Sequence, residues 1–198
     1  MKEILLIGDS LTEFGYRFDG WVAQLSNMFA RRCDVVNRGL SGYSTRWVLN
    51  RFKYLPSRME GADYEPPVLA TLFFGANDAA ETYQGIDVEE YRQNIVEIVR
   101  ILKDELKIPR VVIIAPPPIV EAAWVQYLQL TRDPSITESN RIDTRTKLFS
   151  DAVLELCADG GALGGGRAVA LDTRPSFTHD GSGLADDQAN VRGDFYVD

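Results

Sequence analysis

Five short apolar segments, in which polar residues do not alternate with apolar ones, recur along the chain. Such unbroken runs are typical of parallel strands that are covered on both faces. Segments with helical periodicity separate them, and this alternation predicts a parallel sheet with right-handed crossovers. The predicted strands are residues 3–7, 34–37, 68–74, 110–115 and 167–171.

The first predicted helix lies between the first two strands and carries one apolar stripe. Its apolar side chains recur at intervals of three and four residues, which places them on one helical face. We therefore expect this stripe to pack against the sheet. Its members are Phe18, Trp21, Val22, Leu25, Met28 and Phe29.

Two later segments are also predicted to be helices. In the first of them, Asp87 and Glu90 form a capping arrangement that satisfies free amide groups at the helix start, and Pro109 stops the helix. The second runs from about residue 140 to residue 157 and ends at Gly160. The side chains expected to face the core are Tyr91, Ile95, Ile98, Leu102 and Leu106 in the first, and Phe149, Val153 and Leu156 in the second.

These elements predict one α/β domain over residues 1–198, a three-layer α/β/α sandwich with a flavodoxin-like order of five parallel strands. A chain of 198 residues can bury a sizeable core in a single domain. In this order the first and third strands are neighbours at the topological switch point, where a crevice opens. We therefore expect a ligand site at the carboxyl ends of the first three strands.

Small and polar residues follow each of the first three predicted strands directly. Because the carboxyl ends of parallel strands lie at one edge of a sheet, Ser10 and Asn77 should face each other across the crevice, with Gly42 close by. A serine hydroxyl, a glycine amide and a carboxamide are the groups that acyl transfer uses. The three blocks read Gly-Asp-Ser-Leu at residues 8–11, Asn-Arg-Gly-Leu-Ser-Gly at 37–42 and Gly-Ala-Asn-Asp at 75–78.

These three blocks, in this order and with this spacing, resemble the GDSL or SGNH family of serine ester hydrolases, and within it the isoamyl acetate-hydrolysing esterase branch. The resemblance implies the SGNH hydrolase fold and hydrolysis of small or medium acyl esters, such as acetates, through an acyl-enzyme. It implies that Ser10 is the nucleophile and that the oxyanion hole consists of the Ser10 N–H, the Gly42 N–H and the Asn77 carboxamide. It implies no metal and no organic cofactor.

Each of these residues also has a structural interpretation. A loop glycine such as Gly42 is more often a turn residue than an oxyanion donor, and Asn77 alone can be an ordinary turn former. Asp9 and Asp78 are interpreted as hydrogen-bond acceptors that support their loops. Four aromatic side chains either line an acyl or alcohol pocket or belong to the core: Trp47, Phe74, Trp124 and Tyr127.

The resemblance also implies a histidine base, but this sequence has no histidine at the expected position. The related esterases carry an Asp-x-x-His block near the carboxyl end, followed by a final helix. Residues 194–198 resemble the lead-in to that block, which implies Asp198 as the triad acid and predicts that the polypeptide is truncated there, with the final helix missing. The one histidine in the chain, His179, has Ser176 rather than an aspartate three residues before it. Without a base, we expect turnover to be lower by a factor of about 10⁴ to 10⁶.

Other functions are weighed against ester hydrolysis. A catalytically impaired relative would bind acylated ligands or a protein partner through the same cleft, and the missing base favours this alternative. In a further alternative, His179 replaces the base. A dinucleotide-binding fold is disfavoured because no Gly-x-Gly-x-x-Gly follows the first strand, and an α/β-hydrolase because the chain has no Gly-x-Ser-x-Gly elbow.

Composition and charge argue against some kinds of binding partner. A formal net charge of −8 argues against nucleic acid, which normally binds a basic surface. No segment approaches the length of a membrane-spanning helix, and the apolar start is too short for a secretory signal. Cys33 and Cys157 have no metal-like spacing and are expected to be reduced thiols of a cytoplasmic protein. The expected partner is a small-molecule ester, and the sequence leaves the oligomeric state open.

Overall fold

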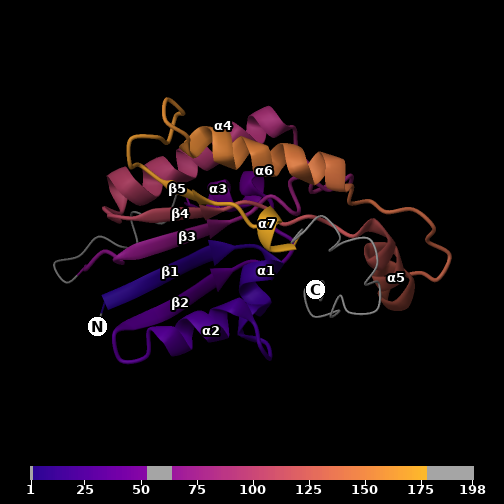
Figure 1. Cartoon of the computed structure of the whole chain (residues 1–198), viewed down its shortest axis with the longest axis horizontal. Coiled ribbons are helices and arrows are strands. Elements are labelled where there is room, and N and C mark those ends of the chain that lie inside the picture. Colours follow the sequence, from indigo (N-terminus) through magenta and orange to yellow (C-terminus); the bar gives the residue numbers. More distant parts are fainter. Residues whose placement is uncertain (1, 53–63, 178–198) are drawn as a thin grey trace.

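The computed structural model describes residues 2–52 and 64–177, which form a five-stranded sheet between layers of helices (Figure 1). All neighbouring strands are parallel, and their order is β2-β1-β3-β4-β5. This confirms the predicted three-layer, flavodoxin-like order and all five predicted strands. The strands are β1 (Lys2–Gly8), β2 (Cys33–Gly39), β3 (Leu69–Phe73), β4 (Val111–Ile114) and β5 (Val169–Leu171).

Helices cover both faces of the sheet, and the main core lies on the face that carries the longest ones. In Figure 1, α4 and α6 lie along the top of the view and α2 lies along the bottom, with the five strands between them. The helices are α1 (Ser10–Glu13), the 3₁₀ turn η1 (Phe14–Tyr16), α2 (Trp21–Met28), α3 (Thr45–Phe52), α4 (Val88–Arg100), the π-helical turn η3 (Ile101–Glu105), α5 (Glu121–Thr131), α6 (Asp143–Cys157) and α7 (Arg174–Phe177).

The apolar stripes predicted for the two long helices are buried as expected. Every stripe residue of α4 and η3, from Tyr91 to Leu106, is at most 1% exposed. In α6, Phe149 and Val153 are similarly buried, and the Phe149 ring packs 5.0 Å from the Tyr91 ring. A buried aromatic side chain removes a large apolar area from water. This face of the sheet therefore supplies most of the hydrophobic stabilisation.

The ends of α4 differ from the prediction. Asp87 is the N-cap residue, but its side chain accepts no cap hydrogen bond, and Glu90 instead accepts two hydrogen bonds of 2.6 Å from Arg46 of α3. A bidentate guanidinium partner competes well for a carboxylate, so the predicted capping arrangement is wrong. The helical segment also ends before Pro109, because Lys107 adopts a left-handed φ of 56°.

Fewer side chains of the predicted apolar stripe, residues 18–29, are buried in the structure than the periodicity predicts. The helix begins only at Trp21, after Gly20, so Phe18 lies outside it and is 93% exposed. Met28 is 72% exposed, whereas Val22 is fully buried against Ile4 and Leu6 of β1. The prediction was wrong for Phe18, which precedes the helix, and for Met28, whose side chain is exposed, whereas Phe29 packs against the buried cluster.

The first three strands end in register, which brings the three sequence blocks to one edge. Gly8 of β1 pairs with Gly39 of β2 and with Phe73 of β3. Beyond the strands, the Leu40 N–H donates to Gly8 O at 2.8 Å and the Asp9 N–H donates to Phe73 O at 3.3 Å. The loops that follow β1, β2 and β3 therefore begin side by side.

Some predictions concern parts of the chain that the structure does not describe. The predicted truncation after Asp198, with the final helix missing, concerns a region outside the described residues, and the extent of the domain to residue 198 stays a prediction. Within residues 2–52 and 64–177, no helix is long and apolar enough to span a bilayer.

Candidate functional site

Ser10 stands directly after the first strand, as its sequence position predicts. It is the first residue of α1 and is half-buried, and its hydroxyl makes no hydrogen bond within the described part of the chain. Asp9 holds the turn before it, because its buried carboxylate accepts from the Leu11 N–H at 3.0 Å. The structure thus confirms Asp9 as a structural acceptor, and it leaves the Ser10 hydroxyl available beside a cavity.

The second block packs closely against the segment that carries Ser10. The Asn37 carboxamide donates to Thr12 O at 2.6 Å and accepts from the Gly39 N–H at 2.8 Å. A side chain at Gly39 would meet the Glu13 backbone nitrogen at 2.1 Å, so only glycine fits this contact. The Ser41 N–H also donates to the Glu13 carboxylate. These contacts fix the loop after β2 relative to the serine.

Gly42 lies in a tight turn after the second strand. The Tyr43 N–H donates to Leu40 O at 3.1 Å, and Gly42 has a φ of 76° at the third position of this turn. Glycine adopts that conformation at little steric cost. The Gln84 side chain donates to Gly42 O at 2.8 Å and fixes the turn from outside. Neither hydrogen bond uses the Gly42 N–H, which therefore can serve as a donor to a ligand.

Asn77 joins the loops after the second and third strands. Its side chain is 2% exposed, its Nδ2 donates to Tyr43 O at 3.0 Å, and its Oδ1 accepts from Arg141 Nη2 at 2.8 Å. A carboxamide has two N–H donors, and the second one makes no hydrogen bond to another residue of the described ranges. Asn77 is therefore a buried amide that bridges two loops and keeps a second N–H that is compatible with the predicted donor role.

Asp78 supports the loop that presents Asn77. One of its carboxylate oxygens accepts from the Thr45 N–H at 2.9 Å and from the Thr45 hydroxyl at 2.5 Å. The same hydroxyl accepts from Asn94 Nδ2 of α4 at 3.1 Å. Burial raises the pKa of Asp78 to about 6, because desolvation disfavours the charged form more than these hydrogen bonds favour it. The structure confirms the predicted supporting role.

Asp78→Asn is expected to remove part of the pH dependence of folding. Because the folded-state pKa is raised from 3.8 to about 6, the stabilisation that protonation of this carboxyl provides is fully present below about pH 4 and is lost as the pH rises through about 6. Urea unfolding between about pH 4 and pH 7 should show the wild type losing stability relative to the variant. A difference that is constant with pH would contradict this prediction. Asp34→Asn, at an exposed position of β2, is the matched control.

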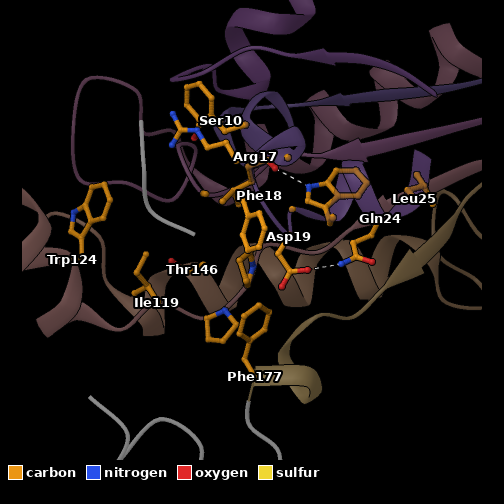
Figure 2. Close-up of a pocket in the computed structure, with 18 of the residues that line it drawn as sticks. Ser10, Arg17, Phe18, Asp19, Gln24, Leu25, Ile119, Trp124, Thr146 and Phe177 are labelled. Carbon is orange, nitrogen blue, oxygen red and sulfur yellow. Dashed lines mark hydrogen bonds between the residues drawn. The ribbon is translucent and has the colours of Figure 1, made fainter. Parts of the chain in front are cut away.

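A cavity of about 640 Å³ opens beside Ser10. Figure 2 shows the serine on its wall, with Phe18, Ile119 and Trp124 around the same space. Trp124 thus lines a pocket, as one of the two interpretations predicted, and its ring stacks on Tyr127. The apolar side chains of the wall include Phe14, Phe18, Leu25, Ile119, Trp124 and Phe177.

Of the four candidate aromatic residues, Trp124 alone lines this cavity; Tyr127 stacks on its ring, and the other two lie elsewhere. Phe74 is 1% exposed and belongs to the core. Trp47 stacks on Tyr83 at 5.7 Å and meets Tyr43 edge-on at 5.8 Å. Both therefore have structural surroundings that explain them.

Sequence analysis missed two residues that hold the candidate donors. Gln84 binds the carbonyl of Gly42, and Arg141 binds the side chain of Asn77 from 64 residues further along the chain. No local pattern distinguishes either side chain from a surface residue. Two further candidates, Asp198 and His179, lie outside the described residues.

The residues that the structure describes include no group of three or more His, Cys, Asp or Glu side chains that could hold a metal ion. Ser10 places a half-buried hydroxyl beside an apolar cavity, and the loops that follow the two neighbouring strands carry a glycine N–H and a carboxamide. Such a set can bind a carbonyl group and stabilise negative charge on its oxygen.

Comparison with known proteins gives similarity over most of the chain. A model described as the GDSL-like Lipase/Acylhydrolase family matches residues 6–188. The isoamyl acetate-hydrolyzing esterase 1 homolog of Bos taurus is 38% identical over 167 residues, which are 80% of this chain and 64% of that protein. A GDSL esterase/lipase of Arabidopsis thaliana is 35% identical over 184 residues, 90% of this chain and 73% of that relative.

A solved structure shares the fold. AlinE4, an SGNH-hydrolase family esterase, superposes with a TM-score of 0.59 and 21% sequence identity, over 90% of this chain and 79% of that one. At this identity the likeness concerns the fold alone. The matched region spans 64% of the length of the bovine relative, so the activity of whole relatives does not transfer directly.

Proposed function

Because this chain belongs to the GDSL-like lipase/acylhydrolase family, we propose that it hydrolyses carboxylic esters with Ser10 as the nucleophile. One observation carries the proposal. Ser10, Gly42 and Asn77 follow three adjacent strands that end in register, and Ser10 lines an apolar cavity. A fold alone does not establish a function, but this set of groups is suited to acyl transfer.

In the proposed reaction, Ser10 Oγ attacks the ester carbonyl carbon while a base takes its proton. The carbonyl oxygen becomes an oxyanion, which accepts hydrogen bonds from the Gly42 N–H, the spare Asn77 N–H and the Ser10 N–H. Collapse of this intermediate breaks the bond to the alcohol, which leaves with the proton from the base. Water then hydrolyses the acyl-serine by the same steps and releases the acid.

The base and its orienting acid are proposed from the resemblance of the carboxyl-terminal block. Asp198 is proposed as the acid that orients a histidine, and that histidine takes the proton from Ser10. His179 is the alternative base within the chain. A cytoplasmic location, consistent with two cysteines that form no disulfide, also belongs to this proposal.

The cavity supports esters of small or medium size as substrates. Its volume of about 640 Å³ lies within the range of small-molecule sites, about 300–1,000 Å³. The apolar wall favours a hydrocarbon chain on the acyl or the alcohol side of the ester. The names of the relatives, which include isoamyl acetate-hydrolyzing esterase homologues, support acetates among the candidates.

Burst kinetics of the full-length gene product with p-nitrophenyl acetate tests the proposal. An acyl-enzyme should release about one equivalent of p-nitrophenol per chain before the steady state. A fluorophosphonate should label one serine, and peptide mass analysis should place the label on Ser10. A label on another residue would contradict the assignment of the nucleophile.

The same experiment separates ester hydrolysis from the alternative of a catalytically impaired binding protein. Such a protein would show neither a burst nor a label, yet acylated ligands would still raise its melting temperature. A heat-unfolded sample is the control for non-specific reaction with the probe. Labelling that survives unfolding would not come from an organised site.

A further inference from the structure

Arg141 links the loop that carries Asn77 to the start of α6. Its guanidinium donates to Ala76 O at 2.5 Å and to Asn77 Oδ1 at 2.8 Å. It also lies 4.6 Å from the centre of the Trp124 ring, and it lines the cavity beside Ser10. One half-buried cation thus contacts the candidate oxyanion donor, its neighbouring carbonyl and a ring of the cavity wall.

These contacts determine which way the Asn77 amide points. Arginine only donates hydrogen bonds, so the amide oxygen must face Arg141 and the NH₂ group must face Tyr43 O. In the opposite orientation the NH₂ would meet the guanidinium, and the amide oxygen would meet a carbonyl oxygen. Both hydrogen bonds would be lost in a side chain that is 2% exposed, and unpaired buried polar groups are costly.

The positive charge of Arg141 also makes the Asn77 amide a stronger hydrogen-bond donor. A hydrogen bond to the oxygen of a carboxamide withdraws electron density from its nitrogen, and hydrogen bonds in a chain strengthen one another. The N–H of Asn77 that is not bound to Tyr43 O then donates more strongly to a negative oxygen. This effect grows as charge develops on that oxygen, so it favours the transition state over the bound ester.

We propose that Arg141 is a positioning residue of the oxyanion hole, which fixes and polarises the Asn77 carboxamide. This inference rests on the proposed function, because it assumes that Asn77 stabilises an oxyanion. Arg141 does not touch the reacting atoms in this role. It acts through the Asn77 side chain.

Arg145 offers a matched comparison within the same chain. It is also half-buried, donates to Ala79 O at 2.8 Å and Ile86 O at 2.9 Å, and lies 5.6 Å from the Phe149 ring centre. Both arginines therefore anchor the region after β3 through carbonyl groups and lie over an aromatic ring. The contact with the Asn77 side chain belongs to Arg141.

The experiment compares Arg141→Met with Arg145→Met in the full-length gene product, with p-nitrophenyl acetate as substrate. Arg141→Met should lower kcat by about 10- to 100-fold with KM changed less than about threefold, a smaller loss than removal of an oxyanion donor. Arg145→Met should lower the melting temperature similarly but leave kcat within about threefold. Arg141→Lys, which keeps the charge but not the planar fork, should recover part of the loss, and it serves as the readout if the methionine variant does not fold.

A double-mutant cycle with Asn77→Ala shows whether Arg141 acts through the amide. In the Asn77→Ala background, Arg141→Met should change kcat by less than about twofold, because the group it positions is already gone. Equal losses in both backgrounds, or equal losses for the two arginines, would overturn the inference and leave the esterase proposal standing. If Asn77→Ala itself left kcat unchanged, the oxyanion assignment of the proposed function would fail, and the inference with it.

Discussion

Ser10→Ala is expected to lower kcat for p-nitrophenyl acetate by about 10⁴- to 10⁶-fold and to abolish the burst of p-nitrophenol. The methyl group of alanine cannot form the acyl-enzyme, so only substrate binding and the oxyanion donors would remain to assist direct attack by water. KM should change little, because the cavity that binds the ester keeps its other walls. Steady-state and stopped-flow measurements on the full-length gene product test both expectations.

The same substitution should leave the fold intact, which separates catalysis from stability. The Ser10 hydroxyl makes no hydrogen bond to the residues the structure describes, and the helix cap is provided by Asp9. We expect the free energy of unfolding to change by less than about 0.5 kcal/mol. Ser26→Ala, which removes a hydroxyl that donates to Val22 O within α2, is the control and should retain full activity. Activity of the Ser10 variant above about 1% of wild type would exclude Ser10 as the nucleophile.

Asn77→Ala has the second largest expected effect, a fall in kcat of about 10²- to 10³-fold, which corresponds to roughly 3–4 kcal/mol of transition-state stabilisation. The variant loses the spare N–H that is proposed to bind the oxyanion, and it also loses the hydrogen bonds of Asn77 with Tyr43 O and Arg141. The measurement is kcat and KM for acetate esters, together with the rate of inactivation by a fluorophosphonate. Both rates should fall, because negative charge also develops on the phosphoryl oxygen in the transition state of inactivation, and the same donors would bind it.

Asn77→Asp distinguishes the loss of a donor from the loss of packing. Aspartate has nearly the shape of asparagine, and its carboxylate would pair with Arg141, which already donates to position 77 at 2.8 Å. The other carboxylate oxygen would face Tyr43 O in place of the Nδ2 donor, so we expect a folded chain with a lower melting temperature, which a melting curve would show. The negative charge beside the oxyanion should make kcat no higher than in Asn77→Ala. An aspartate variant with near wild-type kcat would refute the oxyanion role.

Much of the candidate site could be predicted, because its residues follow the first three strands of the chain and these strands are neighbours in the sheet. Unbroken apolar runs predict buried strands, and parallel strands present their following loops at one edge. Ser10, Gly42 and Asn77 each come directly after such a run. Their predicted convergence rests on strand order and register, and the structure confirms that order and that register.

Side-chain partners could not be predicted in this way. Glu90 suits a helix cap in the sequence, yet in the structure it binds Arg46, which lies 44 residues earlier. Phe18 fits the periodicity of α2, yet it lies outside the helix and lines the cavity. Periodicity describes neighbours along one element, whereas these contacts depend on where a different element comes to lie.

By itself the sequence determined the order of strands and helices, the faces that α4 and α6 bury, and the three loops that meet at the sheet edge, because each depends on patterns within about a dozen residues. The tertiary structure alone decided the orientation of the Asn77 amide, the partner of the Gly42 carbonyl and the hydrogen bonds of the buried Asp78 carboxylate. Each of these requires a partner brought from 33 to 64 residues away. Hydrogen bonds and desolvation act over a few ångströms of space, and only folding brings such distant residues within that range.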